Sequence, residues 1–207
     1  MNNKIGQGYL HVIIGPMMSG KTTLLRSHLY KWQIAGRRVS YVNITIDERS
    51  NNKNIKKVGS ASTHNLQLAN YPLYSEQKIT SFEELDTNYD VFGFDEIQFY
   101  SSGFIQEICT MVNYLGKIVI CSGLKADFRG QKFGFVMDLI AQADEVSNLH
   151  AICPYCHHQN KDGTALHPAI FTRRLNKSQD LIIPGGTGEY VAVCRFHYFM
   201  EKLPELN

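Results

Sequence analysis

The sequence GPMMSGKTT at residues 15–23 decides the fold. It contains a glycine, four variable residues, a second glycine, a lysine and a hydroxyl residue, with the fixed positions at Gly15, Gly20, Lys21 and Thr22. Glycines in this pattern allow backbone N–H groups to curl around phosphate oxygens, and the lysine places its charge on the β and γ phosphates. The threonine hydroxyl is a ligand for Mg²⁺. The stretch therefore predicts a loop that binds the phosphates of a nucleotide.

The segments on either side of this loop support the prediction. Residues 9–14, YLHVII, are apolar and read as a strand. After Gly20, apolar residues recur at helical spacing at Leu24, Leu25, Leu29 and Trp32. The alternative is a glycine-rich turn with an exposed lysine. It is disfavoured because strand, loop and helix follow one another as a phosphate loop requires.

Apolar segments alternate with helix-like segments along most of the chain. The pattern predicts further strands at 37–44, 91–94, 117–124 and 145–152, and further helices at 81–85, 104–115 and 135–143. Ser81 and Glu84 have the spacing of a capping box, and the polar residues 47–65 read as a long loop. Strands that alternate with helices pair in parallel through crossover connections. We therefore predict an α/β fold of the P-loop NTPase type, with helices flanking a mostly parallel sheet.

Two carboxylates follow the apolar residues 91–94. Asp95 has the place of an acid at the end of a neighbouring strand, from which it would hold Mg²⁺. Glu96, one residue on, could accept a proton from an attacking hydroxyl or water. The alternative is that Glu96 is only a solvated loop charge. A second carboxylate beside a metal ligand adds charge repulsion, and this cost favours the functional interpretation.

Four residues in the last quarter of the chain have the types and spacing of metal ligands. Cys153 and Cys156 form CPYC, and Cys194 and His197 form CRFH. A Cys₃His set binds Zn²⁺ tetrahedrally, and a site filled by four protein ligands is structural. Alternative ligands are His157, His158 and His167, and a Cys153–Cys156 disulfide is a further alternative. The remaining cysteines, Cys109 and Cys121, lie among apolar residues and read as core thiols.

The sequence changes character near Ala151, where short β-like, turn-rich segments begin. We therefore expect a nucleotide-binding α/β domain at 1–150 and a small zinc-ribbon-like domain at 151–207. A chain of 207 residues is long enough for one substantial core and a small appendage.

The composition and net charge limit which partners and which cellular location we expect. The net charge of +2 makes no case for a nucleic-acid channel, so we expect no nucleic-acid partner. No basic-then-apolar signal sequence opens the chain, and no apolar stretch reaches the roughly 20 residues that span a bilayer. We therefore expect no membrane association and a cytoplasmic location. In that compartment cysteines serve as thiols or metal ligands more often than as disulfides.

Several motifs together resemble the zinc-containing type II thymidine kinases, in both their order and their spacing, from about Tyr9 to Tyr198. They are GPMMSGKTT, DER at 47–49, FDEIQFY at 94–100, GLKADFRGQKFG at 123–134, CPYC, GGTGEY at 185–190 and CRFH. The resemblance implies transfer of the γ-phosphoryl group of ATP to the 5′-hydroxyl of thymidine, with deoxyuridine as an alternative acceptor. It also implies Mg²⁺, a structural Zn²⁺, a lasso loop carried by the segment between the two zinc-ligand pairs, a homotetramer, and feedback inhibition by dTTP.

The resemblance assigns roles to individual residues, with Glu96 as the general base. It implies ATP and Mg²⁺ binding by Gly15, Pro16, Met17, Met18, Ser19, Gly20, Lys21, Thr22, Asp47, Glu48, Arg49, Asp95, Glu96, Ile97 and Gln98. The residues implied around the nucleoside are Met17, Phe99, Leu124, Phe128, Phe133, Thr172, Leu181, Ile182, Ile183, Pro184, Gly185 and Tyr190. The aromatic side chains among them can stack on a flat nucleoside base.

Two other functions are compatible with a phosphate loop. One is an ATP-driven motor or helicase, whose acidic box the residues DEIQ at 95–98 resemble. The chain has a single short α/β unit and lacks a second lobe on which such a machine would close. The other is a zinc-containing module that senses a nucleotide without turnover. A substitution of Glu96 would distinguish a kinase from such a sensor.

Overall fold

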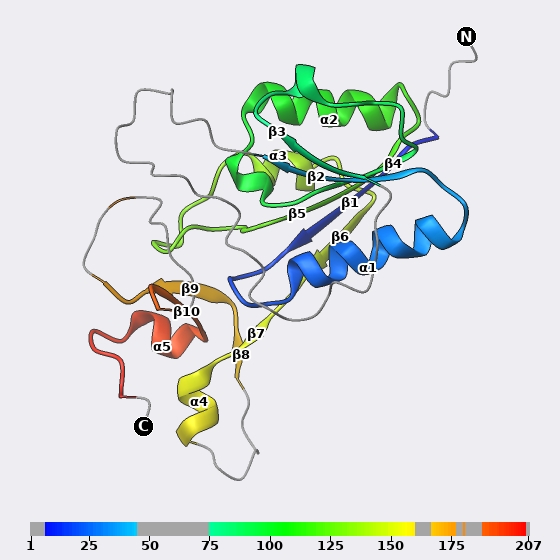
Figure 1. The fold of residues 1–207 in the computed structure, drawn as a ribbon. Helices are drawn as coiled ribbons and strands as arrows, with labels where there is room; N and C mark the ends of the chain where they lie inside the picture. The colour runs from blue at the N-terminus through cyan, green and yellow to red at the C-terminus, as the bar shows by residue number, and fades with distance from the viewer. Residues whose placement is uncertain (1–6, 45–74, 160–166, 177–179, 181–187, 206–207) are drawn as a thin grey trace.

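A six-stranded parallel sheet forms the larger part of the molecule (Figure 1). The computed structural model describes residues 7–44, 75–159, 167–176, 180 and 188–205. In these residues the strand order is β3-β2-β4-β5-β1-β6, and each neighbouring pair is parallel. The strands are β1 (Tyr9–Ile14), β2 (Val39–Ile44), β3 (Glu76–Ile79), β4 (Val91–Phe94), β5 (Ile118–Gly123) and β6 (Glu145–Asn148). The α/β fold with a mostly parallel sheet is thus confirmed.

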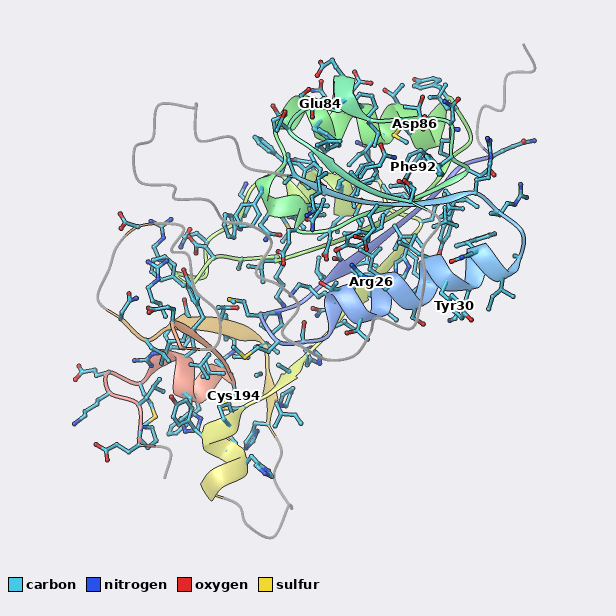
Figure 2. The ribbon with its side chains drawn as sticks, in the orientation of Figure 1. Arg26, Tyr30, Glu84, Asp86, Phe92 and Cys194 are labelled. Atoms are coloured by element: carbon cyan, nitrogen blue, oxygen red, sulfur yellow. The ribbon has the colours of Figure 1, made fainter. Side chains whose placement is uncertain are left out.

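Helices cover both faces of this sheet (Figure 1). They are α1 (Lys21–Ile34) on one face, and α2 (Ser102–Asn113) and α3 (Val136–Ile140) on the other. Leu25 and Leu29 of α1 pack on Ile120 of β5 and are fully buried. Phe92 lies between the sheet and α2 (Figure 2), in a core cluster with Phe104. Each face therefore has its own apolar core, and the sheet between them is a rigid platform for the loops at its edge.

The strand order places the predicted site residues at one edge. Strand β5 lies between β1, which leads into the phosphate loop, and β4, which leads into Asp95. The register pairs Ile14 with Gly123 and Phe94 with Cys121, so the three carboxyl ends lie close together. Ligands of open parallel sheets bind at this edge.

A smaller unit lies beyond the carboxyl ends of β1 and β6 (Figure 1). Its elements are β7 (Ala151–Ile152), α4 (Pro154–Gln159), β8 (Pro168–Ala169), β9 (Phe171–Arg174), β10 (Tyr190–Val193) and α5 (Arg195–Phe199). Strands β7 and β8 pair antiparallel, as do β9 and β10. Its core contains Cys153, Cys156, Cys194 and the apolar residues around them. The change of architecture falls near residue 151, and the division into two domains there stays a prediction.

Several local predictions were wrong in detail. The expected helix at 81–85 is one 3₁₀ turn, η2 (Phe82–Glu84), and the side chain of Ser81, at its N-cap, makes no capping hydrogen bond. The Glu84 carboxylate instead accepts hydrogen bonds from the backbone and hydroxyl of Thr80, both at 2.8 Å. The expected strand at 145–152 is two separate strands, β6 and β7, and β3 was not predicted. Among the described residues, no helix combines the length and apolar character that a bilayer crossing requires.

Candidate active site and metal centre

The predicted phosphate loop connects β1 to α1. Gly20 adopts a left-handed conformation with φ 82°, which a glycine tolerates without strain, and α1 begins at the next residue. The Lys21 ammonium is buried and donates to the carbonyl oxygen of Pro16 at 2.7 Å. Burial lowers the pKa of Lys21, while the nearby carboxylates of Glu96 and Asp95 act in the opposite direction. The loop thus holds a cation against its own backbone, close to two acids.

Asp95 accepts hydrogen bonds from three side chains that come from different elements. Thr22 donates to its Oδ2 at 2.8 Å from the start of α1, and Tyr41 donates to the same oxygen at 2.7 Å from β2. Ser122 of β5 donates to Oδ1, which also accepts the backbone N–H of Glu96 at 3.0 Å. Burial and the Asp95 charge raise the pKa of Tyr41, so its hydroxyl keeps its proton and acts as a donor. Asp95 is therefore fixed at the loop by donors on both sides.

Glu96 follows β4 in a left-handed conformation, with φ 54°. A non-glycine residue in this region stores strain, which persists only where neighbouring contacts hold it. Here Gln98 donates from Nε2 to Glu96 Oε2 at 2.5 Å, and Gln98 Oε1 accepts the N–H of Leu124 at 2.9 Å. Burial, and next the Asp95 charge, raise the pKa of Glu96. Gln98 therefore holds the Glu96 carboxylate and the chain after β5 in one arrangement, and Glu96 is not a solvated loop charge.

The structure brings several predicted nucleoside-site residues together in pairs. Thr172 Oγ1 on β9 accepts the N–H of Met17 at 3.0 Å, which joins the smaller unit to the phosphate loop. The rings of Phe99 and Phe133 meet edge to face, with centroids 5.5 Å apart. Asp47, Glu48, Arg49 and the segment of Leu181, Ile182, Ile183, Pro184 and Gly185 lie outside the described residues.

Two residues that contact Asp95 were missed in the sequence. Ser122 lies near the carboxyl end of β5, and this position alone could have indicated it, since polar residues at such ends face ligands. Tyr41 lies in the middle of β2, where an aromatic side chain reads as core. Its contact with Asp95 depends on the strand order, which no local pattern in the sequence specifies.

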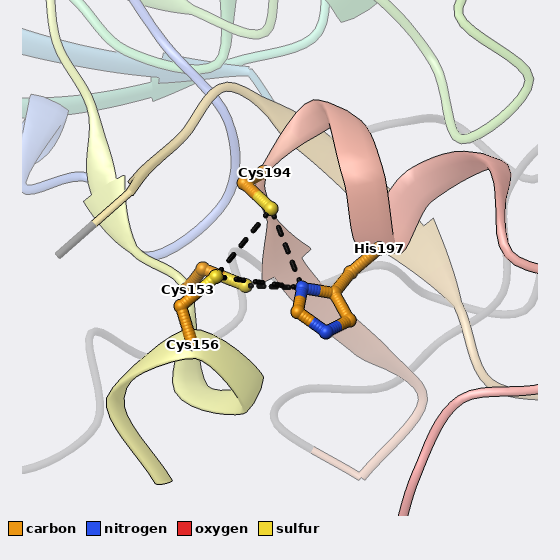
Figure 3. A group of neighbouring side chains, drawn as sticks. All are labelled: Cys153, Cys156, Cys194 and His197. Carbon is orange, nitrogen blue, oxygen red and sulfur yellow. Dashed lines mark hydrogen bonds between the residues drawn. The ribbon is translucent and has the colours of Figure 1, made fainter. Parts of the chain in front are cut away.

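The four predicted zinc ligands converge in the smaller unit (Figure 3). The three sulfur atoms and the Nδ1 atom of His197 all lie within 4.8 Å of one another, and all four residues are buried. His197 Nδ1 is 3.5, 3.5 and 3.3 Å from the sulfurs of Cys153, Cys156 and Cys194. A zinc tetrahedron has ligand-to-ligand edges of about 3.4 to 3.8 Å, given its usual bond lengths. The four residues therefore fit a zinc ion.

Among the described residues, the alternatives to this ligand set are not supported; the side chain of His158 lies outside them. Each of the five cysteines is a free thiol, so Cys153 and Cys156 form no disulfide. His157 and His167 are exposed, and among the described residues no other group of three or more acidic, histidine or cysteine side chains is arranged to hold a metal. Cys121 is buried and Cys109 nearly so, which confirms them as core thiols.

Comparison with known proteins gives one consistent result. The family model described as thymidine kinase matches residues 8–198. The chain is 34% identical over 199 residues to a thymidine kinase of Yaba monkey tumor virus, covering 96% of this chain and 98% of the viral protein. It is 36% identical to thymidine kinase a of Arabidopsis thaliana, covering 96% and 78% of the two chains. It is 35% identical to a thymidine kinase of Mycoplasma genitalium, covering 95% and 86%.

Proposed function

The chain belongs to the thymidine kinase family, and we propose that it transfers the γ-phosphoryl group of ATP to the 5′-hydroxyl of thymidine to give dTMP. The observation that carries this proposal is the meeting of Thr22, Asp95 and Glu96 at the end of the sheet. The phosphate loop, a metal-binding acid and a separate carboxylate are the machinery that phosphoryl transfer needs, because catalysis there consists mostly of positioning and charge neutralisation.

The phosphate loop is the binding site for ATP in this proposal. The backbone N–H groups of Gly15, Met18, Ser19 and Gly20 line the phosphates, and Lys21 supplies the charge. Pro16 and Met17 belong to the same loop, and the N–H of Met17 is bound to Thr172. Lys21 exchanges its contact with the Pro16 carbonyl, 2.7 Å long, for phosphate oxygens. Asp47, Glu48, Arg49 and Ile97 complete the proposed ATP site.

Thr22 and Asp95 are the residues that would hold Mg²⁺. Both offer hard oxygen atoms, which this ion prefers, and these oxygens lie 2.8 Å apart. When bound, Mg²⁺ neutralises charge on the transferring phosphate. Tyr41 and Ser122 keep the Asp95 carboxylate oriented through their hydroxyl groups.

Glu96 is the general base of the proposed reaction. Its carboxylate accepts the proton of the thymidine 5′-hydroxyl as the oxygen attacks the γ-phosphorus, while the bond from that phosphorus to the β–γ bridging oxygen breaks and ADP leaves. Gln98 holds one carboxylate oxygen at 2.5 Å, which leaves the other oxygen to accept the proton. The Gln98 Nε2 group only donates hydrogen bonds, so Gln98 does not take the proton that Glu96 accepts.

The nucleoside lies among residues that come from both units. We assign its base to Met17, Phe99, Leu124, Phe128, Phe133, Thr172 and Tyr190, together with the segment 181–185. The contact between Met17 and Thr172 supports this assignment, since it brings the smaller unit against the phosphate loop. The Cys₃His zinc site then braces the unit that covers the nucleoside and takes no part in the chemistry.

The remaining parts of the proposal concern assembly, regulation and location. We propose a cytoplasmic homotetramer that is inhibited by dTTP, on the resemblance to type II members of the family. Size-exclusion chromatography with light scattering and a dTTP titration of the initial rate test the first two directly.

A nucleoside panel tests the proposed activity. The protein is incubated with ATP, Mg²⁺ and each of thymidine, deoxyuridine, deoxycytidine and deoxyadenosine, and the monophosphate products are separated and counted. Phosphorylation of thymidine is the expected result. ATP hydrolysis that DNA stimulates, with no nucleoside phosphorylated, would establish a motor protein instead, and nucleotide binding without turnover would establish a sensor.

A further inference from the structure

Arg174 is a buried arginine in β9, with 8% of its surface exposed. It pairs across the antiparallel ladder with Tyr190 of β10. A buried arginine is costly unless its guanidinium is engaged, so its partners indicate its role. The neighbouring Arg173 is on the opposite side of the strand, because side chains alternate along a strand.

The guanidinium of Arg174 contacts three parts of the chain at once. Its central carbon lies 3.7 Å from the centroid of the Phe128 ring, which is a close cation–π contact. Nη2 donates to the hydroxyl of Tyr190 at 2.5 Å, and Nη1 donates to the carbonyl oxygen of Asp180. Asp180 directly precedes in sequence the segment 181–185. Arg174 thus joins Phe128, Tyr190 and Asp180.

Phe128 is held from a second direction as well. It lies in a turn closed by Asp127, whose Oδ1 accepts the N–H groups of Arg129 and Gln131, both at 2.9 Å. The carbonyl oxygen of Phe128 accepts the hydroxyl of Tyr198 on α5 at 3.0 Å. The backbone is therefore fixed by the turn and by α5, and Arg174 fixes the ring.

We propose that Arg174 is a positioning residue for nucleoside recognition, which orients the rings of Phe128 and Tyr190 so that the base meets them already in place. This inference rests on the proposed function, because that function assigns the two rings to the base. Holding the rings in advance lowers the entropy lost on binding. Arginine suits the role because its planar group stacks on one ring and donates in its own plane to two other partners. A lysine ammonium has no planar group with which to do both.

Arg173 provides a matched control from the same strand. Its Nη1 donates to the carbonyl oxygens of His197 and Met200, both at 2.6 Å, and to that of Tyr198 at 3.1 Å. These bonds secure the end of α5 and make no contact with the rings of Phe128 and Tyr190, although Tyr198 also holds the backbone carbonyl of Phe128. Arg173→Ala therefore reports what loosening α5 does while the contacts of Arg174 with the two rings remain.

The experiment compares wild type, Arg174→Met, Arg174→Lys and Arg173→Ala. Isothermal titration gives the dissociation constants for thymidine and for ATP, and steady-state kinetics give kcat and each KM. Because hydrogen bonds from charged groups are among the stronger ones, we expect Arg174→Met to weaken thymidine binding by about tenfold. ATP binding, kcat and zinc content stay near wild type. Arg174→Lys keeps the cation–π contact and restores part of the loss, while Arg173→Ala lowers Tm without a selective loss of thymidine affinity.

Other outcomes overturn the inference. Equal weakening of thymidine and ATP in Arg174→Met, or unchanged thymidine affinity, shows that Arg174 is only structural. An equal, selective loss in Arg173→Ala leads to the same conclusion. If Arg174→Met does not fold, the same criteria apply to Arg174→Lys. Failure of the proposed function is seen separately, because wild type would then phosphorylate no thymidine.

Discussion

Thr22 donates a hydrogen bond from Oγ1 to Asp95 Oδ2 across 2.8 Å, although the two residues are 73 positions apart in the chain. The bond joins the first turn of α1 to the residue that follows β4, and β5 lies between β1 and β4 in the sheet. A hydroxyl and a carboxylate in this position form the expected Mg²⁺ ligand pair of a phosphate loop.

Removal of the Thr22 hydroxyl is expected to weaken the use of Mg²⁺. Thr22→Val keeps the branched shape and loses the ligand oxygen, so the Mg²⁺ concentration for half-maximal activity rises by about tenfold or more. Thr22→Ser keeps the oxygen and remains close to wild type. A Mg²⁺ titration of the initial rate measures both, and equal curves for the valine variant and wild type would show that Thr22 is not a ligand.

Loss of one cysteine of the Cys₃His site is expected to release the metal and unfold the smaller unit. Wild type carries about one zinc per chain, and Cys194→Ser carries little, with a lower Tm, because zinc binding supplies folding free energy. Cys109→Ala is the control, since this thiol lies in α2, away from the cluster. Elemental analysis and thermal unfolding give both quantities. Zinc retained at one per chain in Cys194→Ser would exclude that residue as a ligand.

His11 is expected to make the folded state less stable in acid. Its ring is buried beside Ser147, with Nε2 2.9 Å from the hydroxyl. Burial lowers the pKa of His11 below 6.5; Glu145 opposes this shift, and His28, whose ring packs against it, adds to it. The unfolded chain therefore binds this proton more readily, so stability falls as the pH drops through 6.5 toward the folded pKa.

Denaturant unfolding at several pH values between about 7.5 and 5.5 tests this expectation. His11→Gln removes the titrating group, and its free energy of unfolding should decline less than that of wild type over this range. The comparison cancels contributions from other groups, including the zinc ligands. Parallel curves for the two proteins would show that His11 binds its proton equally in both states.

Gly93 leaves the space on the sheet that the ends of the Leu29 and Leu25 side chains of α1 occupy. A Cβ atom at this position would lie 2.4 Å from Cδ1 of Leu29 and 3.1 Å from Cδ1 of Leu25. Gly93→Ala overpacks this core and should lower the free energy of unfolding by about 1–3 kcal/mol. Gly103→Ala in α2 is the control, since its Cβ meets only Ser101 Oγ at 3.9 Å. An unchanged free energy in Gly93→Ala would contradict the tight contact.

The sequence predicted the elements that have strong local signals. Strands 9–14 and 91–94 were predicted with the bounds that the structure has, because their apolar residues are buried on both faces. Strand β3, with the sequence EQKI, was missed because it is an edge strand with mostly polar residues. Its pairing with β2 depends on the whole sheet.

The candidate site likewise contains residues that the sequence predicts and residues that it does not. The phosphate loop, Asp95 and the zinc ligands form motifs whose spacing specifies their chemistry, and the structure brings each set together. Arg174 has no such motif. A charged residue in a strand normally predicts an exposed side chain, and its contacts with Phe128 and Tyr190 arise only when two strands and a distant turn meet.

The role of Glu96 is tested most directly by Glu96→Gln. The amide is close in shape to the carboxylate but cannot accept the proton, so kcat for thymidine phosphorylation should fall by about a hundredfold or more. The dissociation constants for ATP and thymidine should stay within about threefold of wild type, since no binding group is lost. Glu107→Gln, an exposed position on α2, is the control. Thymidine turnover by Glu96→Gln at the wild-type rate would contradict the assignment of Glu96 as the base.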